Sequence, residues 1–263
     1  MIVPRSAPHS RRARPGLVLF LVGLVLAACN APAAVAPSVS ASAPTATVAP
    51  SAPPSIAASQ TAAGGPLAEA LVAKLAADPL ILHIEQVATA EATVNGTKST
   101  VDVTLTGDIS GDDLSLTIKG SGGGQVLDQE LVVLDETSFV RSGGGPWQSA
   151  PRSAVESTLA DLVKAIRLVS DPQDLRVVGP ETIDGQALQH LTASRAIPYA
   201  PSTGGSGQYD VFDIWVLDDG TPVLAKTAFS ATDLAGNKGT GTTEFTFSRF
   251  GGPIEIVAPS VAP

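Results

Sequence analysis

The only cysteine of the chain, Cys29, stands at the end of a short apolar run and directly after the small-residue stretch Leu26–Ala28. Four arginines and no acidic residue precede that run, which extends from Gly16 to about Ala28. A transmembrane helix needs about 20 apolar residues, so this run is too short to span a bilayer comfortably. A basic start, an apolar centre and small residues at the end are typical of an export signal.

The motif Leu26-Ala27-Ala28-Cys29 resembles the lipobox of bacterial lipoproteins, in which a peptidase cuts before the cysteine and the sulfur then carries a lipid. The resemblance implies that residues 1–28 are a lipoprotein signal peptide and that Cys29 is acylated, with chains such as palmitate. Two or more chains hold a protein firmly at a membrane, whereas one chain binds only reversibly. We therefore expect a lipid-anchored protein on the extracytoplasmic face of the cell membrane. Two alternatives stay open, a twin-arginine signal at Arg11-Arg12 and an uncleaved anchor.

Removal of the signal peptide makes the chain strongly acidic. It takes away four of the 16 basic residues and none of the 25 acidic ones, so the net charge becomes −13. A surface with this charge repels nucleic acid, and no lysine or arginine cluster remains, which excludes nucleic-acid binding. With Cys29 acylated, no thiol is left for a disulfide, so the fold depends on its aliphatic core.

Residues 29–65 are expected to form an Ala/Pro/Ser-rich tether. From Asn30 to about Gly65 the chain has no charged residue and shows no hydrophobic periodicity. Such a segment cannot bury enough apolar surface to offset the entropy lost on ordering. Its repeated prolines favour extended stretches, so we expect a semi-rigid spacer that lifts the following domain away from the membrane.

The folded domain is expected over residues 66–259, with 260–263 as a short tail. Two amphipathic helices are predicted within this domain. The first covers Pro66–Ala77, where leucines and a valine recur on one face at helical spacing. The second covers Ser153–Val169, where a capping box with Glu156 starts the helix and an apolar stripe follows.

The rest of the domain alternates between apolar and polar residues, as antiparallel strands do. About ten strands separated by turn signals are expected. They cover Leu80–Thr93, Thr100–Gly107, Leu114–Lys119, Leu131–Leu134, Thr137–Val140, Leu175–Val178, Ala187–Ser194, Phe212–Val216, Val223–Phe229 and Phe245–Phe247, before a short Ile254–Val257. The predicted fold class is α+β, a strongly curved antiparallel half-barrel sheet wrapped over one or two amphipathic helices.

Three stretches of this region resemble LolA-like lipoproteins. They are Val178–Gly185 with His190–Thr192, Phe212–Gly220, and Thr246–Pro253. The likeness is greatest to the LppX and LprG branch, bacterial lipoproteins in which a half-barrel sheet surrounds a helix. It implies a LolA-like lipid-binding domain with an apolar cavity for an acylated lipid or glycolipid. It also implies lipid transport across the cell envelope, an envelope transport partner and no cofactor.

The apolar faces of the predicted strands and of the second helix would form the wall of this cavity. Plain core packing explains the same residues, because a sheet covered by a helix must bury them, so both interpretations stay open. The predicted wall consists of Val101, Val103, Leu105, Leu116, Leu159, Val163, Phe212, Ile214, Val216, Phe229, Phe245 and Phe247. Side chains of this size contribute about 1.5–3 kcal/mol each when buried, so an acylated ligand needs no charged anchor.

The mature chain offers little catalytic chemistry. Its two histidines, His83 and His190, lie in predicted strands, where a local hydrogen bond is the commoner role. No nucleophile motif or metalloprotease motif accompanies them. Asp108, Asp112 and Asp113 lack the spacing of an EF-hand loop, so a solvated turn is expected there. The protein is therefore predicted not to be an enzyme and to hold no metal.

Two functions from different classes remain. In the first, the protein binds acylated lipid between its sheet and its helix and carries it across the envelope. In the second, it is a tethered interaction or sensor module, similar to RseB-like regulators, with a fully packed core and no lipid ligand. A hollow wide enough for an acyl chain would separate the first function from the second.

Overall fold

The computed structural model describes residues 65–94, 97–122, 124–167, 169–200, 205–234 and 236–261. The predicted signal peptide, Cys29 and nearly all of the tether lie outside these residues. Within the described ranges, no helix is long and apolar enough to cross a membrane. The first helix of the described chain begins at Pro66, where the sequence predicted a helix start.

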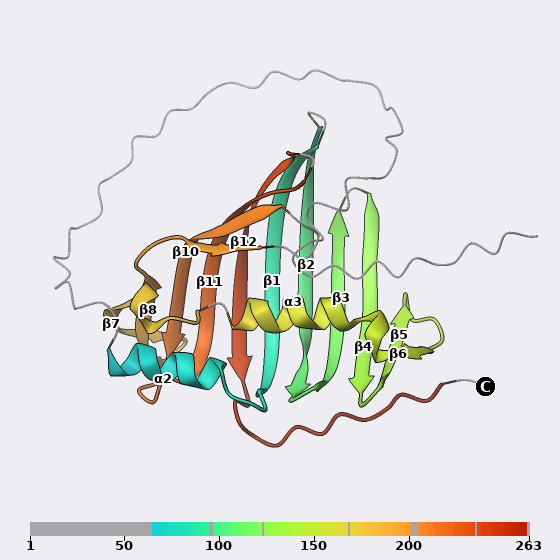
Figure 1. Ribbon diagram of the computed structural model, residues 1–263, viewed down its shortest axis with the longest axis horizontal. Helices are drawn as coiled ribbons and strands as arrows, with labels where there is room; N and C mark the ends of the chain where they lie inside the picture. Colours follow the sequence, from blue (N-terminus) through green and yellow to red (C-terminus); the bar gives the residue numbers. More distant parts are fainter. Residues whose placement is uncertain are drawn as a thin grey trace, which may run out of the picture.

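One open sheet of twelve antiparallel strands forms the body of the described chain (Figure 1). The strand order is β6-β5-β4-β3-β2-β1-β12-β11-β10-β8-β7, and β9 pairs with β10. The strands are β1 (Ile81–Val94), β2 (Thr97–Ser110), β3 (Asp113–Gly122), β4 (Gln125–Leu134), β5 (Thr137–Ser142), β6 (Gln148–Pro151), β7 (Leu175–Ile183), β8 (Gln186–Ala193), β9 (Ile197–Tyr199), β10 (Ser206–Val216), β11 (Pro222–Thr232) and β12 (Lys238–Ser248).

Two α-helices of the described chain, α2 (Pro66–Leu75) and α3 (Glu156–Ile166), lie on one face of this sheet (Figure 1). Helix α3 crosses the middle strands, and α2 lies at the lower ends of β10 and β11. An ion pair of 3.1 Å between Lys74 Nζ and Asp219 Oδ2 joins α2 to the β10–β11 turn. The predicted class, a curved antiparallel half-barrel with one or two helices on its inner face, is confirmed.

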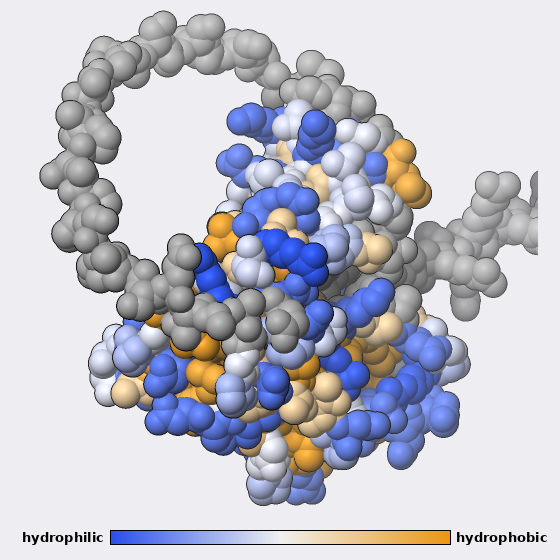
Figure 2. Space-filling model, turned by 60° about the vertical axis from the view of Figure 1, so that its left-hand side comes forward, coloured by the Kyte–Doolittle hydropathy of each residue, from blue (hydrophilic) through white to orange (hydrophobic). Residues whose placement is uncertain are grey.

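The main core lies between the helices and the lower half of the sheet. Alternate residues of β1 and β2, such as Leu82 and Leu105, point to the helical face, as the alternating sequence predicts. They pack with Leu71 of α2 and Leu162 of α3, each at most 1% exposed. In the space-filling view, hydrophobic surface lies mainly in this lower half, interleaved with hydrophilic residues (Figure 2).

The upper half of the sheet, beyond the helices, is packed by a row in which large side chains lie beside glycines. The row runs across neighbouring strands through Phe229, Gly241, Ala90, Val101 and Gly122, which are register partners. A Cβ at Gly241 would come within 2.6 Å of the Phe229 ring, and one at Gly122 within 2.6 Å of Val101. The large residues therefore fill the space that the glycines leave open.

Several predicted boundaries are wrong. There are twelve described strands, not about ten, because β6 and β9 are held by pairing with β5 and β10 and have little apolar alternation of their own. No strand forms at Ile254–Val257. Helix α3 starts at Glu156 after Val155 and has no side-chain cap, so the Ser153 capping box does not form. Both helices end earlier than predicted, at Leu75 and Ile166.

Candidate functional site

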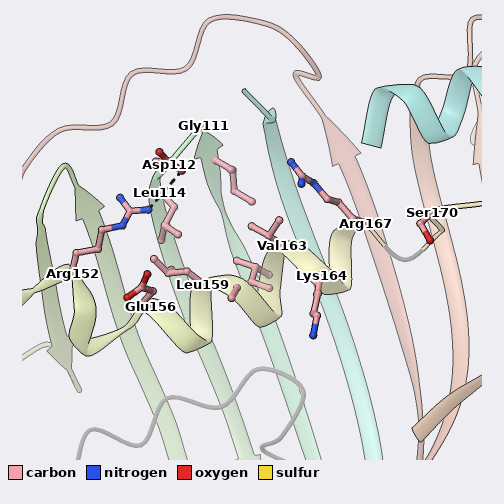
Figure 3. A pocket seen from close by; sticks show the side chains of 13 residues that line it. Gly111, Asp112, Leu114, Arg152, Glu156, Leu159, Val163, Lys164, Arg167 and Ser170 are labelled. Carbon is pink, nitrogen blue, oxygen red and sulfur yellow. Dashed lines mark ion pairs between the residues drawn. The ribbon is translucent and has the colours of Figure 1, made fainter. Parts of the chain in front are cut away.

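A pocket of about 610 Å³ lies between α3 and the turn that joins β2 to β3 (Figure 3). We call it the α3 groove. Its lining residues are Ile109, Gly111, Asp112, Leu114, Arg152, Glu156, Leu159, Ala160, Leu162, Val163, Lys164, Arg167 and Ser170. It combines an apolar floor with charged residues at both ends of the helix.

The floor is built from two elements that are distant in the sequence. Ile109 and Leu114 are register partners on β2 and β3, so they stand side by side just before the turn. Leu159, Leu162 and Val163 come from consecutive turns of α3 and line the groove from the helix. Figure 3 shows Leu159 and Val163 across the groove from Leu114. Four of these five side chains are buried and Val163 is half-buried, so the floor is a continuation of the core that opens to the surface.

The two ends of the groove differ in charge. At the start of α3, Arg152 lies near two carboxylates, with its Nη2 3.9 Å from Asp112 Oδ1 and Glu156 also lining the groove. Its Nη1 donates a hydrogen bond of 3.1 Å to the carbonyl oxygen of Asp135. At the other end, Lys164 and Arg167 form no ion pair with any carboxylate whose side chain the structure describes. Figure 3 shows Arg167 reaching back over the groove and Lys164 extending from the other side of the helix.

Arg167 also ties the two helices together. Its Nη2 donates a hydrogen bond of 3.2 Å to the carbonyl oxygen of Ala77, just after α2. This bond uses one of the five N–H donors of the guanidinium group and leaves the others for solvent or a ligand. The hydrogen bond to Ala77 therefore holds the Arg167 side chain near the groove.

The structure brings only two of the twelve predicted cavity-wall residues, Leu159 and Val163, to the groove. Leu159 also belongs to the main core. The other wall residues in that core are Leu105, Leu116, Phe212, Ile214, Val216, Phe245 and Phe247, and the half-buried Val103 packs against it. Val101 and Phe229 lie in the packed row of the upper sheet. Within the described residues, the space between sheet and helices is thus largely filled by the protein's own side chains.

Both histidines make the local hydrogen bonds expected of strand residues. His83 Nδ1 lies 2.8 Å from Asp108 Oδ1 on the neighbouring strand. The ring nitrogens of His190 each lie 3.0 Å from a carboxylate oxygen, one of Glu181 and one of Asp213, so the ring links three strands. A stack on the ring of Trp215, with centroids 4.5 Å apart, holds it in place.

The aspartates near the β2–β3 turn do not converge. Asp108 pairs with His83, Asp113 Oδ1 accepts a hydrogen bond from the backbone N–H of Asp135, and Asp112 lies near Arg152. The described residues contain no group of three or more histidine, cysteine, aspartate or glutamate side chains that could hold a metal ion.

The residues of the groove that the sequence did not single out are Ile109, Leu114, Leu162 and the charges at the ends of α3. Leu114 was visible as part of a predicted strand and Leu162 as part of the helical stripe, whereas Ile109 lay between two predicted strands. Their meeting depends on where α3 crosses the sheet, and no local pattern encodes that crossing. The one signal in the sequence that could have indicated the α3 groove is the presence of basic residues at both ends of this amphipathic helix.

Comparison with known proteins finds only remote likenesses to solved structures. No family model matches its sequence, and no curated protein matches either. Among solved structures, a DUF1329 family protein from Desulfovibrio piger has 14% identity and a TM-score of 0.27, covering 72% of this chain and 93% of that one. A LolA superfamily protein from Nitrosomonas europaea has 9% identity and a TM-score of 0.26, covering 72% and 92%.

A third match is MucB in a complex with MucA, with 15% identity and a TM-score of 0.26, covering 72% of this chain and 56% of that one. The family that the sequence resembles is thus among the structures found. Likenesses of this size carry no argument about ligand or partner.

Proposed function

We propose that the protein is a lipid-anchored lipoprotein of the cell envelope that binds an acyl chain in the α3 groove and carries the lipid across the envelope. The ligand is thereby placed on the flank of α3, and not in the interior of the half-barrel. The protein acts by binding and catalyses no reaction. Acylation of Cys29, which is part of this proposal, would keep the domain at the extracytoplasmic face of the membrane.

The observation that carries the proposal is the apolar floor of the groove. Its volume of about 610 Å³ falls within the range of about 300–1,000 Å³ typical of small-molecule sites. Ile109, Leu114 and Leu159 supply aliphatic surface without a hydrogen-bonding group, which matches the chemistry of a hydrocarbon chain. Burial of each methylene group contributes about 0.8 kcal/mol, so a short stretch of chain suffices for binding.

A second candidate function has its own support. Eight of the twelve predicted wall residues belong to the main core, which leaves little room for a multi-acyl lipid inside the half-barrel. This favours a tethered interaction or sensor module, in which the α3 groove would take a side chain of a partner protein.

Native mass spectrometry separates the two candidates. The chain from residue 29 onward, carrying Cys29→Ala to prevent acylation, is purified from bacterial cells without detergent. The lipid-binding proposal predicts a second species, heavier by the mass of one lipid, and saturable uptake of a fluorescent fatty acid. A single bare mass together with no fatty-acid uptake would leave the interaction module as the better account.

Two matched variants test the location of the site. Val163→Trp places an indole ring in the groove from a half-buried position and should abolish uptake of the fatty acid. Val126→Trp makes the same change on β4 at a side chain that is 84% exposed, and uptake should be unchanged. Equal loss in both variants, or in neither, would place the ligand elsewhere.

A further inference from the structure

The charge distribution along the α3 groove points to the class of lipid, and this inference rests on the proposed function. We infer that the groove selects an anionic amphiphile with an alkyl or acyl chain. Its phosphate or carboxylate head lies at the C-terminal end of α3, beside Arg167, and Lys164 adds positive charge from the other side of the helix. Its chain runs back along the floor toward Leu159.

The two ends of the α3 groove differ in their balance of charge. Arg152 faces Asp112 and shares its end of the groove with Glu156, so positive charge is balanced there. Arg167 and Lys164 add two positive charges at the opposite end, and no described carboxylate forms an ion pair with either one. An anion is therefore attracted to one end of the groove and repelled by the two acids at the other.

The positive charge at the Arg167 end of the groove contrasts with the acidic rest of the molecule. The chain from residue 29 carries a net charge of −13, so its long-range field repels anions. Binding of an anionic head then depends on short-range contacts with Arg167, strengthened by the partly apolar surroundings of the groove, while Lys164 contributes through its charge. A guanidinium group is suited to this task because its planar donors match the oxygens of phosphate and carboxylate.

A structural role at the end of α3 is the alternative for Arg167 and Lys164. Basic residues at the end of a helix stabilise it by interacting with its last carbonyl groups. Arg167 already meets a carbonyl through its hydrogen bond to Ala77, and this bond leaves most of its donors unused. Its guanidinium group leans over the groove and does not fold away from it (Figure 3).

Isothermal titration calorimetry of the full mature chain carrying Cys29→Ala tests the inference with three probes below their micellar concentrations. Dodecyl phosphate combines the chain with an anionic head, dodecyl maltoside has the same chain with an uncharged sugar head, and inorganic phosphate has no chain. We expect dodecyl phosphate to bind at least about tenfold more tightly than dodecyl maltoside. Inorganic phosphate alone should not bind, because the floor contributes most of the affinity.

Variants at the two cations complete the test. Arg167→Gln should weaken binding of dodecyl phosphate by about tenfold, and Lys164→Gln by a smaller factor, while binding of dodecyl maltoside stays the same. Arg167→Lys keeps the charge and should retain part of the affinity for dodecyl phosphate. A merely structural role through Ala77 would weaken binding of both dodecyl probes alike in Arg167→Gln. Lys119→Gln on the exposed face of β3 is the matched control and should have no effect.

The outcomes are distinct. Equal affinity for the two dodecyl probes, unchanged in Arg167→Gln, would overturn the inference and leave the proposed function in place. Tighter binding of dodecyl maltoside would overturn it in favour of a glycolipid ligand. Binding of inorganic phosphate as strong as that of dodecyl phosphate would identify an anion site without a lipid. No binding of any probe would remove both the inference and the proposed function.

Discussion

Helix α3 should lose its place on the sheet when its central anchor is shortened. Leu162 is 1% exposed and packs in the main core on the side of α3 that faces the sheet. Substitution of a fully buried leucine by alanine costs about 2–5 kcal/mol, through lost apolar transfer and the cavity that remains. Since a domain of this kind has about 5–15 kcal/mol of stability in all, Leu162→Ala should remove a large part of it.

The effect should appear first in the helix itself. Helix α3 has 11 residues, and an isolated helix shorter than about 12–15 residues is marginal in water. Its stability therefore comes from packing, and the weakened helix should detach while the sheet stays folded. The α3 groove would be lost with it, so uptake of a fatty acid should fall together with helix stability.

Hydrogen exchange measures the local opening of α3. Urea unfolding followed by circular dichroism measures the stability of the whole domain. We expect faster exchange of the α3 amides in Leu162→Ala and a lower unfolding midpoint. The matched control is Leu234→Ala, the same change at a side chain that is 82% exposed, which should alter the free energy of unfolding by less than about 0.5 kcal/mol. Unchanged α3 exchange and an unchanged midpoint in Leu162→Ala would refute the view that packing on the sheet holds the helix.

Three further predictions concern other parts of the chain. Cys29→Ala should move the protein from the membrane fraction to the soluble fraction on immunoblots, and persistent membrane association would indicate an uncleaved anchor. Gly241→Val should lower the free energy of unfolding by about 1–3 kcal/mol, because its Cβ would lie 2.6 Å from the Phe229 ring; an unchanged urea midpoint would contradict this packing. Burial raises the pKa of Tyr199 to about 12 and that of Tyr209 as well, so the ultraviolet absorbance of tyrosinate should appear near pH 12 in the folded chain and near about pH 10 in urea. These are the only two tyrosines, and their neutral forms stabilise the fold below pH 10 and lose that effect as pH rises through 12; titration near 10 in the folded chain would contradict their burial.

The sequence predicted the sheet where alternation was strong. In β2, Val101 and Leu105 point to the inner face and Asp102 and Thr104 to the outer one, as expected. Strand β6 was missed because it contains little apolar alternation and exists through its pairing with β5. Such a strand depends on its neighbour, which a local pattern does not record.

The start of α3 was predicted wrongly for a similar reason. Ser153 and Glu156 have the spacing of a capping box, yet Ser153 lies in a 3-10 turn and Val155 precedes the helix. Val155 is 1% exposed, so burial of its side chain outweighs a local cap of about 1 kcal/mol. The α3 groove was likewise only partly predictable from the sequence. The apolar stripe of α3 was found, whereas its meeting with Ile109 and Leu114 is a long-range contact.

The centre of the sheet is a seam between the beginning and the end of the domain. Strand β1 pairs with β12, so that His83 meets Ser248, which follows 165 positions later. Until the last strand has emerged, β1 and β11 lack a partner on one side and the half-barrel cannot close around its core. Such distant pairing is slow to form, so the sheet should fold more slowly than a helical protein of the same length.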